Sequence, residues 1–474
     1  MVFSSLTFLF FFLPIALLLY YGVGRLEKPN SVLLKNLILF LISLVFYAWG
    51  EPYYVLLLLL STGIDYFCGY FADHYRGYNR AKLFLWLSVV ANLSLLVFFK
   101  YSTLLVQTIN GVFHTQFYLG SIALPIGISF YTFQTMSYTI DVYRGHAPVQ
   151  KNFIALGAYV SMFPQLIAGP IVRYEQIAPQ LVHRRFCFAQ FSQGVQRFIV
   201  GLAKKVLLAN NVGLLWTWVS TTSLSELSAL SAVLGILGFG FQIYFDFSGY
   251  SDMAIGLGKM FGFEFPENFD HPYVSRSITE FWRRWHITLS SWFRDYVYIP
   301  LGGNRRGTFR TVMNLLIVWF LTGLWHGASY NFILWGLYYG LLLILEKLFF
   351  TRWLERCHHS FLPRLYTLVA VFIGWILFAL EDFGQLGQYF QAIFANSLFA
   401  DRTSLYLLSH FGGLLLLCIL FSLPLTSFLG LHRPSVQRRK WYAVCSNLCL
   451  LLIFVVSIAH LVSLTYNPFL YFRF

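Results

Sequence analysis

Charged side chains are scarce in this 474-residue chain. Only 11% of the residues are charged, whereas 58% are hydrophobic and 20% are aromatic, and the mean hydropathy is +0.65. Soluble globular domains carry about 25% charged residues. The composition therefore excludes an ordinary soluble domain and predicts an all-α polytopic membrane protein.

Acidic residues are scarcer than basic ones, at 19 Asp and Glu against 33 Lys and Arg, which gives a net charge of +14. The basic residues fall mostly in short clusters between apolar runs, as in 25–28 and 438–440. This placement is typical of residues that set membrane topology and contact anionic lipids, so membrane lipids are expected partners and nucleic acid is not.

Several chemical motifs are absent. The six cysteines form no CxxC pair, so the sequence indicates neither a disulfide framework nor a zinc site. There is no G-x-S-x-G, H-E-x-x-H or G-x-x-x-x-G-K-[ST] motif. The first 24 residues lack a basic start and a small-residue cleavage site, which favours a retained membrane helix over a removed signal peptide. We expect no bound metal or cofactor.

Long apolar windows recur along the chain, and most of them have about the 17–25 residues that cross a bilayer. They lie near 3–23, 33–50, 54–72, 83–99, 188–219, 227–245, 311–325, 327–350, 363–380, 404–428 and 441–465. We expect ten to twelve spans in one membrane-embedded domain covering residues 1–474. Basic links alternate with links poor in Lys and Arg, which predicts that the N- and C-termini are both extracytoplasmic.

Two segments look irregular within this pattern. Residues 101–145 contain Pro125 and Gly127 and predict broken or re-entrant helix, which needs cover from protein or a cavity. The run from Asp246 to Asp252, DFSGYSD, favours a helix cap or turn over a metal site.

Residues 277–331 are too polar to face lipid, yet they lie between apolar runs. Ser277 and Glu280 fit a capping box that starts a helix of about twenty residues. On that helix Arg283 and Arg294 share one face, whereas Trp282 and His286 share another. Such a basic helix is expected at the membrane interface or on the floor of an internal funnel.

The two histidines of this stretch, His286 and His326, can be interpreted as catalytic or as structural residues. An ionisable group inside a membrane protein is costly and often functional, and a neutral imidazole can act as general base toward a hydroxyl or thiol. Either histidine can equally be a structural residue whose nitrogens are hydrogen-bonded. His326 precedes Gly327 and Ala328, so we expect it at a helix end where another group can approach closely.

Residues 242–305, 324–340 and the end NPFLYFRF together resemble the membrane-bound O-acyltransferase family. The resemblance covers nearly the whole chain. It is closest to the bacterial branch that O-acetylates alginate, peptidoglycan and other cell-envelope polysaccharides, which includes the teichoic-acid D-alanylation protein. It implies a ring of membrane helices, with re-entrant and interfacial helices, around a central funnel.

The resemblance also implies roles for individual residues. His326 in WHGA matches the catalytic histidine of the family, and His286 in RWH matches a second, supporting histidine. The aromatic motif at 469–474 implies that Tyr471 relays the acyl group outward, although an aromatic membrane anchor would have the same composition. Arg283, Arg284 and Arg294 are candidates to attract the phosphates of a donor.

The predicted activity is therefore that of a membrane-bound O-acetyltransferase in the bacterial cytoplasmic (inner) membrane. A cytoplasmic thioester, acetyl-CoA, would be the acyl-donor substrate, and a polysaccharide such as alginate or peptidoglycan the final acceptor. An extracytoplasmic transferase of the SGNH type, with a Ser nucleophile, would be the partner. The alternatives are a polysaccharide or acyl transporter that makes no bonds, and a lipid O-acyltransferase.

Overall fold

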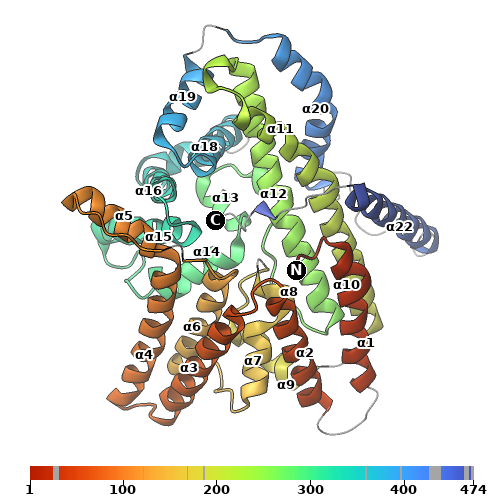
Figure 1. Cartoon of the computed structure of the whole chain (residues 1–474). Helices are drawn as coiled ribbons and strands as arrows, with labels where there is room; N and C mark the ends of the chain where they lie inside the picture. Colours follow the sequence, from red (N-terminus) through yellow and green to blue (C-terminus); the bar gives the residue numbers. More distant parts are fainter. Residues whose placement is uncertain are drawn as a thin grey trace. The chain divides into compact units, whose positions relative to one another are not determined.

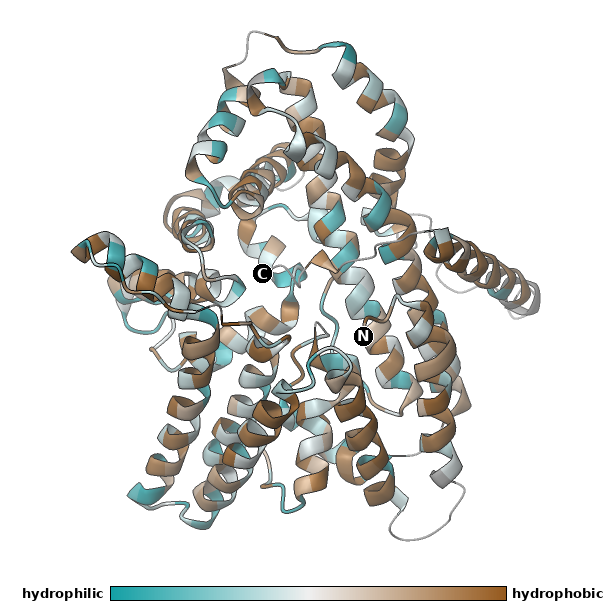
Figure 2. Ribbon diagram, viewed as in Figure 1, coloured by the Kyte–Doolittle hydropathy of each residue, from teal (hydrophilic) through white to brown (hydrophobic). Residues whose placement is uncertain are grey.

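A computed structural model describes residues 1–24, 31–120, 122–167, 169–184, 187–357, 360–395, 398–425, 439–463 and 469–470. Throughout these ranges the regular structure is helical, and the β-type pairing consists of one isolated antiparallel bridge between Phe269 and Trp285. Among the described residues, ten helices are long and apolar enough to cross a membrane. Hydrophobic residues run along most of α2 and α22 (Figure 2). The prediction of an all-α polytopic protein is confirmed.

The fold divides into two compact units. The first consists of Met1–Ile199 and Tyr250–Pro266, and the second of Val200–Gly249 and Glu267–Phe474. Helices α10 and α12 each contribute residues to both. The single membrane-embedded domain expected for residues 1–474 remains a prediction.

The first unit contains the helices from the start of the chain (Figure 1). They are η1 Phe8–Phe12, α1 Leu13–Gly24, α2 Ser31–Ala48, α3 Tyr54–His74, α4 Asn79–Leu96, η2 Val97–Tyr101, α5 Ser102–Phe113, α6 Ile128–Arg144, α7 Phe153–Ser161, α8 Phe163–Leu166, α9 Tyr174–Val182 and most of α10 Phe188–Ala203.

The second unit contains most of the remaining helices (Figure 1). They are η3 Lys204–Ala209, α11 Asn210–Thr221, η4 Leu224–Glu226, most of α12 Ala229–Met260, η5 Pro272–Val274, α13 Ile278–Arg284, α14 Ile287–Phe293, η6 Arg294–Tyr298, α15 Gly307–His326, α16 Tyr330–Leu345, η7 Glu346–Phe350, α17 Thr351–Arg356, α18 Leu362–Ala379, α19 Phe383–Phe394, α20 Arg402–Ser422 and α22 Arg439–Ser463.

Residues 101–145 are more regular than expected. Helix continues from α4 to Phe113, and α6 runs unbroken from Ile128, with nearly all of its side chains buried. The break is confined to the connection before Gly127, which has φ = +78°. A Cβ atom there would lie 2.7 Å from the carbonyl oxygen of Leu166, so glycine permits this close approach.

The prediction of a cap or turn at Asp246–Asp252 is wrong, because these residues lie inside α12. Both acids find basic partners along the helix. Asp246 pairs with Lys205 at 2.8 Å, and Asp252 pairs with Arg197 at 2.8 Å. Their charges are therefore compensated by side chains from elsewhere in the chain, and no cap is needed to satisfy them.

Helices α15 and α16 pack very closely in the second unit. A Cβ atom on Gly323 would lie 2.3 Å from the carbonyl oxygen of Phe332, and one on Gly336 would lie 2.3 Å from that of Trp319. Small residues allow such close approach of membrane helices. This contact fixes the end of α15, where His326 lies.

Candidate active site

The helix predicted to start at Ser277 is much shorter than expected. Its N-cap is confirmed, since Ser277 Oγ accepts a hydrogen bond from the backbone N–H of Glu280 at 2.9 Å. Helix α13 nevertheless ends at Arg284, and α14 begins only at Ile287. Between them His286 has φ = +45°, a left-handed conformation that costs a residue with a side chain about 1–2 kcal/mol.

A distant segment of the chain causes this break. The backbone N–H of Ile287 donates to the carbonyl oxygen of Asn268 at 3.0 Å, and the N–H of Asp270 donates to that of Arg284 at 2.9 Å. Together with the bridge between Phe269 and Trp285, these bonds replace helical ones. The prediction of one helix of about twenty residues is therefore wrong, because tertiary pairing overrides the local pattern.

Helix α13 is also held at its first turn. The buried carboxylate of Glu346, at the end of α16, accepts hydrogen bonds from the backbone N–H groups of Ile278 and Thr279 at 2.5 and 2.9 Å. It also accepts the Thr279 hydroxyl at 2.7 Å. A carboxylate at a helix N-terminus is stabilising. Glu346 therefore ties α13, with its Trp282, to the helix that carries Trp335.

His286 is enclosed, with 1% of its surface exposed. Its Nδ1 lies 3.1 Å from Asn268 Oδ1, which also accepts the Thr288 hydroxyl at 2.9 Å. Its Nε2 has no hydrogen-bond partner within the described part of the chain. Burial lowers the pKa of the His286 imidazole to about 3, so the ring is neutral at physiological pH.

These contacts define the tautomer of His286. Asn268 Oδ1 also lies 3.3 Å from the backbone N of Thr288, and a backbone N–H can only donate, so this Asn268 atom is the oxygen. His286 Nδ1 must then be the donor. In the neutral ring the lone pair is left on Nε2, which can accept a hydrogen bond but cannot donate one.

His326 is the last residue of α15, as expected, and is 3% exposed. Its ring lies 4.8 Å from the ring of Trp335 and 5.6 Å from that of Phe378. The ring of Trp325 contacts both predicted histidines. Its centre lies 5.0 Å from the ring centre of His326 and 5.7 Å from that of His286. The structure thus brings the two histidines into one aromatic enclosure.

The three predicted arginines differ in their surroundings. Arg284 is paired with Glu280 at 3.0 Å and with Asp270 at 2.9 Å, and Arg294 is paired with Asp295 at 2.6 Å. Arg283 makes no hydrogen bond or ion pair with any described residue, and its side chain is exposed.

A cavity of about 420 Å³ lies beside these arginines within the second unit. Arg283 and Arg294 line it, as does Trp282, whereas Arg284 does not. Thr322 lines it as well and precedes His326 by one helical turn, so the two share a face of α15. A second cavity of about 790 Å³ shares Arg283 and contains Arg276 and Lys347. The two cavities therefore lie along α13, and Thr322 places the smaller one at the face of α15 that also carries His326.

Phe469 and Leu470, the last described residues, are linked to His286 through Phe247. The backbone N–H of Leu470 donates to Asp246 Oδ2 at 2.7 Å, and the buried ring of Phe469 lies 6.4 Å from that of Phe247. Phe247 in turn lies 4.7 Å from His286. Tyr471, the predicted relay residue, lies outside the described residues.

Sequence reasoning missed Asn268, Asp246, Trp282 and Trp335 as members of this site. Asn268 stands in the run PENFD, which carries no motif that links it to a histidine 18 residues later. The helical pattern places Trp282 on one face with His286 but does not indicate a cavity. Pairing with distant residues is what distinguishes these side chains, and no local pattern reports it.

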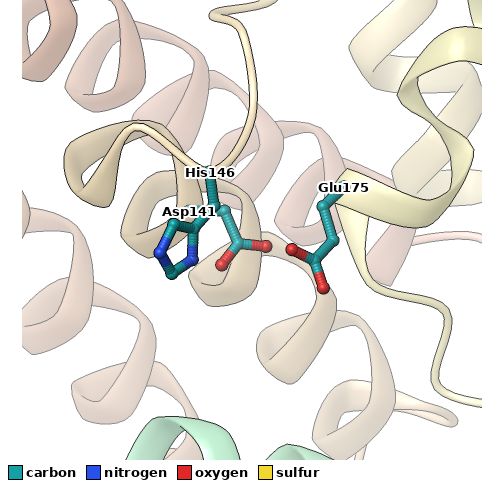
Figure 3. Close-up of side chains that lie close together, drawn as sticks. All are labelled: Asp141, His146 and Glu175. Atoms are coloured by element: carbon teal, nitrogen blue, oxygen red, sulfur yellow. The ribbon is translucent and has the colours of Figure 1, made fainter.

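A separate group of ionisable side chains lies in the first unit. Oxygen and nitrogen atoms of Asp141, His146 and Glu175 lie within 4.8 Å of one another (Figure 3). Such a set can bind a divalent cation. However, Arg173 pairs with Glu175 at 3.3 Å and already supplies positive charge there. Because Glu175 already has a cationic partner, we propose no metal site for this group.

Comparison with known proteins agrees with this architecture. The model of the membrane-bound O-acyltransferase family matches residues 4–382. A probable alginate O-acetylase AlgI of Pseudomonas putida is 39% identical over 500 residues, covering 100% of both chains. The peptidoglycan O-acetyltransferase of Helicobacter pylori is 35% identical over 415 residues, covering 81% of this chain and 77% of the relative. The teichoic acid D-alanyltransferase of Bacillus subtilis is 28% identical over 262 residues, covering 52% of this chain and 65% of the relative.

The chain is thus a multi-pass membrane enzyme of the acyltransferase class. It belongs to the membrane-bound O-acyltransferase family.

Proposed function

We propose that this enzyme moves an acetyl group from cytoplasmic acetyl-CoA toward hydroxyl groups of a cell-envelope or exported polysaccharide, of the alginate or peptidoglycan type. The names of the Pseudomonas putida and Helicobacter pylori relatives support this assignment. The observation that carries it is the burial of His286 and His326 at two helix ends that share contact with Trp325. Acetyl-CoA acts as a consumed substrate and not as a bound cofactor.

In the proposed reaction His326 is the general base. The acceptor oxygen attacks the thioester carbonyl carbon while His326 removes the hydroxyl proton, and that proton then leaves with the departing thiolate. His286 has a positioning role. Because its Nε2 can only accept, it would bind a hydroxyl of the acceptor side other than the one that reacts.

Arg283 is the proposed contact for the phosphates of the donor. Its guanidinium lines both cavities, and no carboxylate of the described chain pairs with it. Arg294 lines the smaller cavity but shares its charge with Asp295. Arg284 has two acidic partners and is a weaker candidate. A free guanidinium is well suited to bind phosphate oxygens.

The acceptor side is assigned to the end of the chain. Tyr471 follows the anchored Leu470, and its phenol would take the acetyl group as an ester that a later nucleophile can attack. An extracytoplasmic SGNH-type transferase with a Ser nucleophile would then pass the group to the polysaccharide. This scheme needs the enzyme in the bacterial inner membrane with both termini extracytoplasmic.

Purified full-length protein in lipid nanodiscs and acetyl-CoA labelled in the acetyl group would test this function. We expect thioester cleavage and acetylation of the protein or an added polysaccharide. His326→Ala should lower the rate about 10²- to 10⁴-fold, as expected for loss of a general base. His410→Ala, an exposed histidine on α20, is the matched control and should retain the wild-type rate.

The same assay separates the alternatives. A protein that moves polysaccharide or acyl carrier without cleaving the thioester would be a transporter, and transfer of long acyl chains to lipid would indicate a lipid O-acyltransferase. Full activity of a well-expressed His326→Ala variant would contradict the assigned base. For the donor, Arg283→Ala should raise the KM for acetyl-CoA, whereas Arg284→Ala should leave it near the wild-type value.

A further inference from the structure

Two buried indole N–H groups without an acceptor lie in the aromatic cluster that contains His326. Nε1 of Trp282 and Nε1 of Trp335 are shielded from solvent and make no hydrogen bond within the described part of the chain. The two residues are 7% and 1% exposed. A buried tryptophan usually finds a partner for its N–H. Trp375 in the same aromatic cluster does so, donating to the Tyr273 hydroxyl at 3.2 Å.

The positions of the two indoles relate them to one another and to the cavity. The ring of Trp335 lies 4.8 Å from that of His326 and 5.6 Å from that of Trp282. Trp282 lines the cavity of about 420 Å³ together with Arg283 and Thr322. Trp282 therefore lines the cavity directly, whereas Trp335 and His326 lie behind it, with Trp335 in ring contact with both Trp282 and His326.

The surrounding structure holds these two donors in place. Trp282 lies on α13, whose first turn is bound by the carboxylate of Glu346. Trp335 lies on α16, and Glu346 directly follows that helix. The rings of Trp319 and Tyr339 pack against both tryptophans. Packing and the contacts of Glu346 thus hold both rings in place before any substrate arrives.

We propose that Trp282 and Trp335 are catalytic residues whose indole N–H groups bind the carbonyl oxygen of the acyl donor and stabilise the oxyanion formed during transfer. An indole N–H is a donor only, so its ligand must present an acceptor. In an apolar enclosure such donors act most strongly on an oxygen that gains charge. This inference rests on the proposed thioester chemistry at His326 and deepens it.

In the proposed site the acetyl group is transferred through the oxyanion that the indoles stabilise. The acceptor hydroxyl oxygen forms a bond to the carbonyl carbon, its proton moves to His326, and the carbonyl π electrons become the oxyanion held by the two indoles. The oxyanion then re-forms the carbonyl, the C–S bond breaks, and the thiolate leaves with that electron pair. The thiolate takes the proton from His326. No oxidant, reductant or metal is required.

Phenylalanine variants test the role of the N–H groups while keeping an aromatic ring. We expect Trp335→Phe and Trp282→Phe each to lower kcat about 10- to 100-fold, somewhat less than loss of a stronger oxyanion donor. The KM for acetyl-CoA should change by less than about threefold, since the donors act mainly in the transition state. Trp375→Phe is the matched control, because it removes an indole whose N–H is already bonded to Tyr273.

A spectroscopic readout makes the test independent of turnover. Acetyl-CoA labelled with ¹³C at the carbonyl is bound to the His326→Ala protein, and its carbonyl stretch is recorded by infrared difference spectroscopy. Hydrogen bonding should move the band to lower wavenumber than in solution. Adding Trp335→Phe or Trp282→Phe should shift it back, whereas adding Trp375→Phe should not.

The outcomes separate the two levels of the hypothesis. If wild-type protein cleaves acetyl-CoA and needs His326, but both Phe variants keep kcat within twofold and the carbonyl band is not shifted, the role of the indoles is refuted and the function stands. If wild-type protein neither binds nor cleaves acetyl-CoA, the proposed function itself is refuted.

Discussion

Asn268 Oδ1 lies 3.1 Å from His286 Nδ1, and both side chains are almost completely buried. The same asparagine binds the backbone and hydroxyl of Thr288 through Oδ1 and binds Ile287 through its carbonyl oxygen. One residue therefore determines the backbone break, the ring orientation and the tautomer of His286. These contacts of Asn268 hold His286 in its left-handed backbone conformation.

Asn268→Asp should change the pH dependence of transfer. A carboxylate still accepts the Nδ1 proton but also stabilises the imidazolium, so it should raise the pKa of His286 from about 3 toward the physiological range. Below the new pKa, Nε2 is protonated and can no longer accept. We expect the transfer rate of the variant to fall as the pH is lowered from about 7 to 5, whereas the wild-type rate should not fall for this reason.

His271 offers a matched control for that experiment. It has the same left-handed backbone, with φ = +44°, and its Nδ1 lies 3.1 Å from Asp270 Oδ1, but its side chain is 39% exposed. Asp270→Asn should therefore leave the pH profile unchanged. Identical profiles for Asn268→Asp and wild type would contradict the positioning role of Asn268.

Stability should also depend on pH through His286. Its pKa of about 3 in the folded state is lower than about 6.5 in the unfolded chain, so the unfolded state binds more protons at intermediate pH. The contribution of the neutral His286 ring to the free energy of unfolding is therefore largest above pH about 6.5. It decreases as the pH falls, by at most about 1.4 kcal/mol per pH unit. In detergent, His286→Gln should show a smaller drop in thermal midpoint from pH 6.5 to 4.5 than wild type. Equal drops would argue against a buried neutral imidazole.

Asp246→Ala should release the end of the chain. It removes the acceptor for the N–H of Leu470 and the carboxylate that pairs with buried Lys205, and breaking such a pair typically costs about 3–5 kcal/mol. We expect faster removal of C-terminal residues by carboxypeptidase and transfer reduced at least about tenfold, by analogy with misplacement of a reacting group.

Asp252→Ala is the control for this chain-end test. Asp252 lies on the same helix as Asp246, and its replacement breaks an ion pair with Arg197 of α10, which is not part of the chain end. Carboxypeptidase should digest this variant at the wild-type rate. If Asp246→Ala frees the chain end but transfer is unaffected, the anchor is real and the relay through Tyr471 is excluded.

The contact between α15 and α16 should tolerate no added methyl group. Gly323→Ala would place a Cβ atom 2.3 Å from the carbonyl oxygen of Phe332, so the helices must separate. We expect a loss of about 1–3 kcal/mol in stability and slower transfer, because the end of α15 that carries His326 shifts. Thermal unfolding followed by fluorescence-detected gel filtration measures the first effect.

Gly413→Ala on α20 serves as the comparison, since a Cβ atom there has no neighbour within 4 Å. Alanine should be neutral or stabilise this helix by up to about 1 kcal/mol. A Gly323→Ala protein as stable and active as Gly413→Ala would show that α15 and α16 can adjust without moving the site.

The sequence by itself determined the membrane class, the positions of most spans and the helix end at His326. Hydropathy is a sum over neighbouring residues, so a window of about twenty of them reports a span whatever the rest of the chain does. Family resemblance through residues 242–305 and 324–340 then indicated the two histidines. None of these inferences needed to know which distant residues meet.

Only the tertiary structure decided the features that depend on contacts between residues far apart in the chain. The pattern from Ser277 predicts a continuous helix. Backbone hydrogen bonds to Asn268 and Asp270 replace the helical ones, and the helix breaks at His286. The local pattern at Asp246 favours a cap, but the residue lies inside α12, where Lys205 and the backbone of Leu470 are its partners. The paired Arg284 and the available Arg283 are adjacent and identical in type. The physical reason is the same in each case: burial, pairing and hydrogen-bond satisfaction are relations between residues far apart in the chain, and a local pattern does not contain them.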